Sequence, residues 1–337
     1  MALALRFAGE NDIKEWDDTV LASINGTIFH TWSWLKIVER HTKTTLYPVM
    51  AYKGNELVAI YPFFVRNHPL FKLAFSPPPG AYLLYLGPLF PGYEHLKQDK
   101  KEGIYSDFLK EIDTLIFKNL GCSYSRINSS PRLFDSRPFY WQKYSVSPYY
   151  TYRIPLLNGA DHVFGQFDRK LRVDIKKAVR EGVTVTIGEK KDLSSIHQAI
   201  LRRFTEQGYK PKNYLPYLSD LYDAFSPENF KIFLAEYKEQ VIGGMIALKY
   251  KDIAFLWVGV PKGNIPGISP NDLVQWEGIQ WACKNGCRYY EEMDSGEDSR
   301  LTSYKSKYNP NIEIWYSATK YSSRIFKIAD FLRKDLG

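Results

Sequence analysis

The stretch from residue 230 to residue 316 constrains the fold of this chain more than any other. It begins with three short runs rich in apolar, β-branched and aromatic residues, at 230–237, 241–248 and 253–260, which are separated by polar turns. Short β-rich runs divided by turn residues predict an antiparallel meander. A Gly/Pro/Asn loop follows, and then a helical pattern over 273–284, a strand over 288–293, a short helix around Lys305 and a last strand over 312–316. This order predicts an α/β fold.

Weak self-similarity indicates that the chain contains two copies of one fold. Three segments of the first half have counterparts in the second half, in the same order: 51–57 with 236–241, 84–88 with 256–260, and 118–124 with 284–289. Because the pairs fall at corresponding points of a hairpin–strand–helix–strand unit, they predict a duplication. We expect a first domain over residues 1–150, including a strand over 81–86, and a second domain over residues 151–321. Residues 129–150 are expected to bridge the two.

Two helical patterns are both basic and amphipathic. The first, over residues 167–182, carries six Lys or Arg residues beside an apolar stripe, and its charges form either a solvated face or a phosphate-contacting face. The second covers residues 322–337 and either docks on the body of the protein or lies on an anionic membrane surface. Residues 209–217 form a basic, aromatic loop that includes Tyr217.

Composition narrows the class of function. The formal charge is +8 and the sequence pI is about 9.0, which favours anionic partners such as phosphates, nucleic acid or acidic lipid. The three Cys cannot form a disulfide framework and have no matching His cluster, so we expect no metal site. The apolar runs are too short to span a bilayer and no leader pattern is present, so we expect a cytoplasmic protein. The six His are scattered and no Gly-x-Ser-x-Gly elbow occurs, which gives nucleophilic catalysis little support.

Several short motifs of the second half match a known family. They are Lys170–Val183, Ile232–Glu236, Ile246–Tyr250, Ile279–Ala282, Tyr290 with Asp294–Gly296, and Tyr304–Tyr308. With them the chain resembles, over about residues 165–315, the GNAT-like domain of the Fem family of peptidoglycan-bridge aminoacyltransferases and its FemAB-like relatives. The resemblance extends more thinly over the first half, where Trp34-Leu-Lys36 precedes the first hairpin. It implies two tandem GNAT-like domains, each a mixed, mostly antiparallel sheet flanked by helices, with the C-terminal helix packed back on the first.

The resemblance also implies an activity and a set of residues. Family members move an amino acid from aminoacyl-tRNA to an amine of a cell-wall precursor, and others are thought to transfer acyl groups from CoA, with no tightly bound cofactor. By this resemblance, Lys305 lies at the reacting carbonyl with Tyr304 beside it. Lys36 matches a first substrate-phosphate contact, and Lys212, with Lys210 as the competitor, matches a second.

Two departures from the family leave the donor open between aminoacyl-tRNA and acyl-CoA. The chain has no long charged helical insertion of the kind that contacts tRNA in some members. The loop over residues 261–270 lacks the Gln/Arg-x-x-Gly-x-Gly/Ala pattern with which GNAT enzymes hold the CoA pyrophosphate, although Gly263 and Gly267 could still cradle an anion.

Each candidate residue has a second interpretation. Lys305 either stabilises the oxyanion of an aminolysis reaction or is a surface lysine on a short helix. Asp294 either accepts the amine proton or caps a helix. Trp257 either lines the acceptor channel or packs in the core. Tyr217 is a further candidate for substrate binding.

Three functions therefore compete. The first is transfer of an aminoacyl or acyl group to an amine of a phosphate-bearing, nucleotide-linked or lipid-linked precursor of the cell envelope, in the cytoplasm or at the inner membrane face. The second is CoA-dependent N-acylation of a nucleotide sugar or small amine. The third is a non-catalytic basic binding module.

Overall fold

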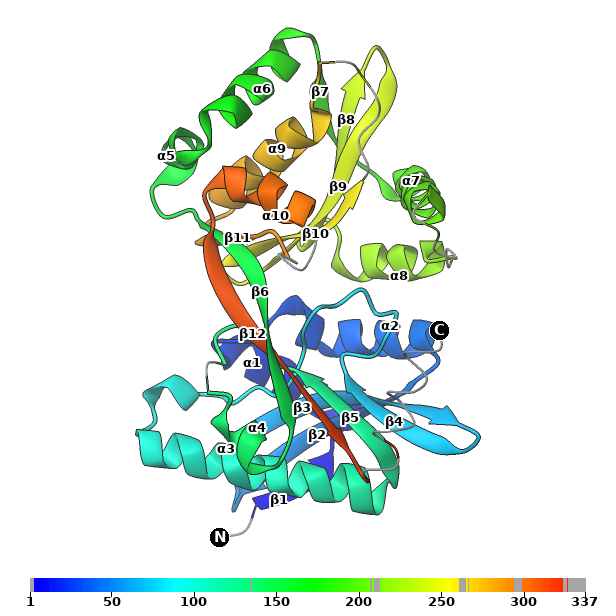
Figure 1. Ribbon diagram of the computed structural model, residues 1–337, viewed down its shortest axis with the longest axis vertical. Coiled ribbons are helices and arrows are strands. Elements are labelled where there is room, and N and C mark those ends of the chain that lie inside the picture. The colour runs from blue at the N-terminus through cyan, green and yellow to red at the C-terminus, as the bar shows by residue number, and fades with distance from the viewer. Residues whose placement is uncertain are drawn as a thin grey trace. The chain divides into compact units, whose positions relative to one another are not determined.

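In a computed structural model of the protein, the described residues are 3–133, 135–206, 208, 213–260, 265, 267–293, 299–323 and 326. The chain forms two compact units, one of Met1–Tyr149 with Ile314–Gly337 and one of Tyr150–Glu313. Each unit is a mixed sheet with helices packed on it (Figure 1). Residues 314–321, which we expected in the second domain, belong to the first unit.

In the first unit, helices lie between groups of strands along the chain. Its strands are β1 (Leu3–Phe7), β2 (Thr45–Lys53), β3 (Glu56–His68), β4 (Phe71–Ser76), β5 (Cys122–Asn128) and, in large part, β12 (Asn311–Tyr321). Its helices are α1 (Ile13–Ala22), α2 (Trp32–Thr42), α3 (Gln98–Asp113), which continues as a π-helix over Thr114–Asn119, and α4 (Arg137–Trp141). Short 3₁₀ turns cover Glu10–Asp12, Ile28–His30 and Tyr93–His95.

The second unit repeats that pattern. Its strands are β6 (Ser145–Pro155, in large part), β7 (Thr184–Gly188), β8 (Phe230–Tyr237), β9 (Gln240–Tyr250), β10 (Ile253–Val260) and β11 (Tyr289–Glu291). Its helices are α5 (Gly159–Gln166), α6 (Arg169–Arg180), α7 (Leu193–Glu206), α8 (Leu215–Phe225), α9 (Pro270–Lys284) and α10 (Ser299–Lys305). Short 3₁₀ turns cover Lys190–Asp192 and Ser306–Tyr308.

The two sheets have the same topology. The first unit pairs β1-β2-β3-β4-β5-β12, and the second pairs β7-β8-β9-β10-β11-β6. In both orders the first three pairings are antiparallel, the fourth is parallel and the fifth is antiparallel. A helix pair joins the first two strands of each order, and a long helix joins the parallel pair. The predicted duplication is therefore confirmed, but the sixth strands are exchanged: β6, the strand that follows β5 in the chain, pairs with β11, and β12, the strand that follows β11, pairs with β5.

One of the three self-similar segments is wrongly aligned. Residues 81–86 form no strand, because Gly80 and Tyr82 adopt positive φ values of 91° and 53° that interrupt extended backbone. The fourth strand of the first unit is β4 instead, ten residues earlier, so 84–88 is not the counterpart of the β10 segment 256–260. The other two segments fall at matching places, the turn of the first hairpin (β2–β3 and β8–β9) and the entry to the fifth strand.

The core of the second unit lies on both faces of its sheet. Helices α6 and α9 cover one face, and α7 and α8 cover the other (Figure 1). Successive residues of β8, such as Ile232 and Phe233, point to opposite faces, and both are buried. Gly243 in β9 lets α9 approach, because a Cβ there would lie 2.6 Å from Asn271 Oδ1.

Within the described ranges, no helix is both long enough and apolar enough to cross a bilayer. The predicted C-terminal helix over 322–337 falls almost wholly outside those ranges.

Candidate active site

The parallel pairing of β10 with β11 is short, and this shapes the site. Ile253–Phe255 of β10 pair with Tyr289–Glu291 of β11, whereas the rest of β10 continues to Val260 paired with β9. The register with β9 shifts between Leu256 and Val258, which makes Trp257 the bulge residue. The residues after Glu291 therefore leave β10 at the carboxyl end of a parallel strand pair, a common place for ligand sites in α/β sheets.

Glu291 is the last residue of β11 and Glu292 follows it, and both glutamates are fully buried. Glu291 is neutralised, because Arg153 Nε and Nη2 donate to its Oε2 at 3.0 and 2.8 Å and Thr151 Oγ1 donates to its Oε1 at 3.1 Å. Successive strand residues point to opposite faces of a sheet, so Glu292 faces away from this ion pair.

Glu292 faces α9 and has only a neutral hydrogen-bond donor. Gln275 Nε2 donates to Oε1 of Glu292, while Oε2 has no hydrogen-bond partner in the described part of the chain. Burial raises the pKa of Glu292 from its ordinary 4.5 to about 8, although Lys305 and Gln275 act in the opposite direction. Glu292 is thus mainly protonated at neutral pH and becomes a carboxylate near pH 8, which suits a residue that accepts a proton during a reaction.

The side chain of Lys305 contacts the backbone just after the end of β11. Its side chain is 6% exposed, so it is not a solvated surface lysine. Its Nζ donates to the main-chain oxygen of Glu292 at 2.6 Å and to that of Met293. Met293 has a φ of 38°, which is rare for a residue with a long side chain. The ammonium group therefore sits at an unusual bend in the backbone, directly beside the Glu292 residue.

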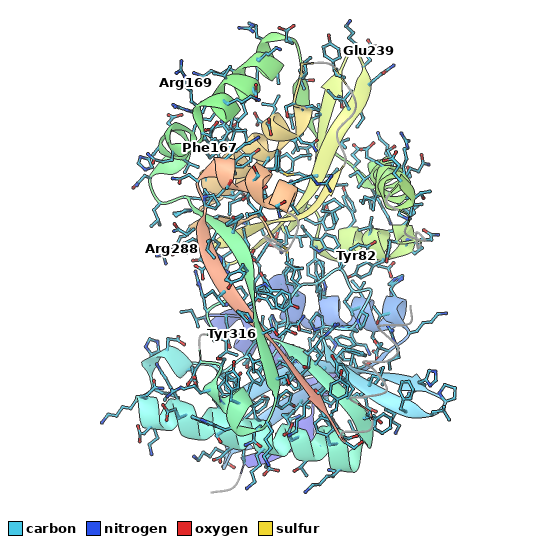
Figure 2. The ribbon with its side chains drawn as sticks, in the orientation of Figure 1. Tyr82, Phe167, Arg169, Glu239, Arg288 and Tyr316 are labelled. Atoms are coloured by element: carbon cyan, nitrogen blue, oxygen red, sulfur yellow. The ribbon has the colours of Figure 1, made fainter. Side chains whose placement is uncertain are left out.

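Asp272, in the first turn of α9, is a second buried carboxylate of this region. It is 5% exposed, and burial raises its pKa even though Ser269 and Tyr304 hydrogen-bond to it. The hydroxyls of Tyr304 and Tyr308 lie 3.3 Å apart, and burial holds both of their pKa values well above the ordinary 10. Phe167 lies at the junction of α5 and α6 (Figure 2), and its ring packs edge-on against that of Tyr308.

The other residues expected from the sequence have different surroundings. Trp257 and Tyr217 are both buried, with ring centroids 6.3 Å apart, and Trp257 also packs on Phe230. Lys36 is in the first unit, exposed on α2 and paired with Glu39. Asp294, Lys210 and Lys212 lie outside the described residues. The substrate-binding roles of these residues, and the catalytic roles of Asp294 and Lys305, remain predictions.

Sequence reasoning did not single out Glu292, Gln275 or Asp272. One signal was present: two adjacent glutamates that end an apolar strand must point to opposite faces, so at least one faces a packed helix. Across the described ranges, no group of three or more His, Cys, Asp or Glu side chains is arranged to hold a metal ion.

Known proteins agree with this architecture. Residues 165–306 match the family model described as acetyltransferase (GNAT) domain. The structure of FemX superposes with a TM-score of 0.71 at 11% identity, covering 93% of this chain and 96% of that one. A tandem GNAT protein from the clavulanic acid biosynthesis pathway gives 0.60 at 10% identity, covering 95% and 99%.

The C-terminal domain of an Agrobacterium fabrum protein described as a lysylphosphatidylglycerol synthetase gives a TM-score of 0.53 at 11% identity and covers 92% of each chain. A search of curated proteins finds no match to the sequence. The resemblance stated from the motifs is thus confirmed for the fold, and the buried cluster lies inside the matched domain. Residues 165–306 thus match an acetyltransferase (GNAT) domain, and most of the chain shares the fold of FemX.

Proposed function

We propose that the protein transfers an aminoacyl or acyl group to an amine of a nucleotide-linked or lipid-linked precursor of the cell envelope. The observation that supports this most directly is the buried cluster of Lys305, Glu292 and Gln275 where β11 leaves β10. It combines one cation with one carboxyl group whose pKa lies near the working pH. The attack of an amine on an activated carbonyl needs both groups: a cation that stabilises the carbonyl oxygen and a carboxylate that accepts the amine proton.

The chemistry can be assigned to these groups. The amine nitrogen forms a bond to the carbonyl carbon, and the bond from that carbon to the oxygen or sulfur of the donor breaks. The proton lost by nitrogen passes through Glu292 and ends on the leaving oxygen or sulfur. The charge of Lys305 stabilises the negative carbonyl oxygen, and a positioned donor at such a site typically contributes about 3–4 kcal/mol.

The acceptor is proposed to carry phosphate. The formal charge of +8 and the exposed basic residues of α6, such as Arg169, Lys170 and Arg180, favour an anionic acceptor. The likeness in fold to a lysylphosphatidylglycerol synthetase supports a lipid-linked acceptor, which would bring the reaction to the inner face of the membrane. Lys36, Lys210 and Lys212 are the proposed phosphate contacts.

Acyl-CoA is the second candidate donor, with a nucleotide sugar or small amine as acceptor, and one local feature favours it. Lys177 Nζ lies 3.1 Å from the position that a Cβ would take on Gly267, just before the N-terminus of the 15-residue helix α9. A lysine beside the free N–H groups of a helix N-terminus suits a pyrophosphate.

The test is a transfer assay read by mass spectrometry. Purified protein is incubated with a mixture of aminoacyl-tRNAs or acyl-CoAs and with nucleotide-linked or lipid-linked precursors that carry a free amine. We expect a mass gain on the precursor, and a fall in turnover of about 100-fold or more in Lys305→Ala. Lys284→Ala, which removes an exposed lysine from α9, is the matched control and should retain turnover. Absence of transfer from every donor, or full turnover in Lys305→Ala, would contradict the proposal.

A further inference from the structure

Two buried carboxylates near the N-terminal half of α9 each keep an oxygen without a partner. In the described ranges, neither Asp272 Oδ1 nor Glu292 Oε2 has a hydrogen-bond partner, and the two side chains are 5% and 0% exposed. Buried carboxylate oxygens are ordinarily satisfied, because leaving them without donors costs stability. Two such oxygens in one region suggest a ligand that supplies donors.

The two carboxylates belong to one cluster. Asp272 and Gln275 are three residues apart on α9, so their side chains share a face of the helix. Gln275 donates to Glu292, which brings that carboxylate to the same face. Both carboxylates act electrostatically on Tyr304 and Tyr308, which lie between α9 and the end of β11.

Charges of both signs surround the two carboxylates, since the charge of Lys305 acts on Glu292 and that of Lys307 acts on Asp272. Lys305 directs its Nζ at two main-chain carbonyls, and Lys307 places its Nζ over the ring of Tyr304, 5.8 Å from the centroid. Asp174 on α6 adds a further negative charge near Asp272. An ammonium group carries three N–H donors and a positive charge, and aromatic rings tolerate it well.

We propose that Asp272 and Glu292 bind the ammonium group of a substrate. The inference rests on the proposed transferase function and names the chemistry of one substrate, which carries a protonated amine at this point. That amine could be the α-amine of an aminoacyl donor or the amine of the acceptor before it loses its proton. Binding of the cation would favour the carboxylate form of Glu292, which could then take up the proton of the amine.

The test measures binding and needs no turnover. Dissociation constants at pH 7.5 are measured by ligand-observed NMR for alaninamide and its neutral match lactamide, and for Nα-acetyl-lysinamide and its neutral match Nα-acetyl-norleucinamide. We expect one ammonium probe to bind about tenfold or more tightly than its match, because a charge-assisted bond to a buried carboxylate is lost in the match. Preference for alaninamide assigns the site to the donor, and preference for Nα-acetyl-lysinamide assigns it to the acceptor.

Variants test whether Asp272 and Glu292 cause the preference for the ammonium probe. Asp272→Asn and Glu292→Gln should each reduce it by about tenfold, whereas Asp252→Asn, which removes a partly exposed carboxylate of the turn between β9 and β10, should preserve it. Thermal unfolding confirms that each variant is folded, and the wild-type comparison stands without any variant. Equal affinity within both pairs, no binding of any probe, or a preference that survives in both variants would overturn the inference. A protein that transfers acyl groups but shows no ammonium preference would lose only this inference and keep the proposed function.

Discussion

Replacing Glu292 with glutamine should change how the stability of the second unit depends on pH. The folded protein holds the Glu292 proton up to about pH 8, whereas the unfolded chain releases it near pH 4.5. Because the folded state binds more protons between these values, the Glu292 contribution to stability is present at low pH and is lost as pH rises. Glutamine keeps the oxygen that accepts from Gln275 and cannot ionise.

The magnitude follows from the pKa interval. At about 1.4 kcal/mol for each pH unit, the interval from 4.5 to about 8 corresponds to about 4–5 kcal/mol. The free energy of unfolding of the wild type, measured relative to that of Glu292→Gln, should therefore fall by about that amount from pH 4.5 to pH 8 and then level off.

Urea unfolding at a series of pH values provides the measurement. Tryptophan fluorescence reports on both units, because Trp257, Trp276 and Trp281 lie in the second unit and the other five Trp lie in the first. The control is Glu239→Gln, at the exposed turn between β8 and β9 (Figure 2), which should run parallel to the wild type. Parallel curves for the wild type and Glu292→Gln would show that Glu292 is not a buried group of raised pKa, and the assignment of the proton acceptor would fail with it.

Three further predictions follow from the same contacts. In an active preparation, kcat/KM should rise about tenfold per pH unit below pH 8 and level off above it. In Glu292→Gln, the pH–rate profile should no longer show this rise. Arg153→Met leaves a buried carboxylate unpaired and should lower the unfolding free energy by about 3–5 kcal/mol, whereas exposed Arg288→Met should change it by less than about 0.5 kcal/mol in the same urea assay. Tyr144→Phe removes the hydroxyl that donates to Asp113 at 2.6 Å and should lower the stability of the first unit by about 1–2 kcal/mol, and an unchanged urea midpoint would contradict this.

Much of the fold was predictable because its elements are strongly periodic. The meander of β8, β9 and β10 and the helix α7 appear where the patterns indicate, since their apolar residues recur with periods close to 2 and 3.6. The exchange of β6 and β12 was not predictable, because the sequence of each is that of an ordinary strand. Nothing in the sequence of either strand specifies which sheet it joins. The strand β4 was missed, and the positive φ of Tyr82 ended a strand that side-chain pattern alone favoured.

The site was only partly predictable. Lys305 was found through a family motif, and its burial agrees with a role away from solvent. Glu292 and Asp272 were not found, because their raised pKa values come from burial between α9, β11 and α10, and burial depends on tertiary packing. Helix α9 buries residues on nearly all sides, so its pattern does not reveal which face carries Asp272 and Gln275.

The exchanged sixth strand also sets an order of events during translation. The last strand of the first unit's sheet, β12, pairs with β5, yet the ribosome makes Tyr150–Glu313 between them. At about 5–20 residues per second, that delay lasts roughly 10–30 s. During this delay, the edge of β5 that later pairs with β12 is unpaired. An unpaired strand edge can pair with a strand of another nascent chain. The half of the protein that is begun first is therefore completed last, and a product truncated near residue 150 would lack the strand that seals it.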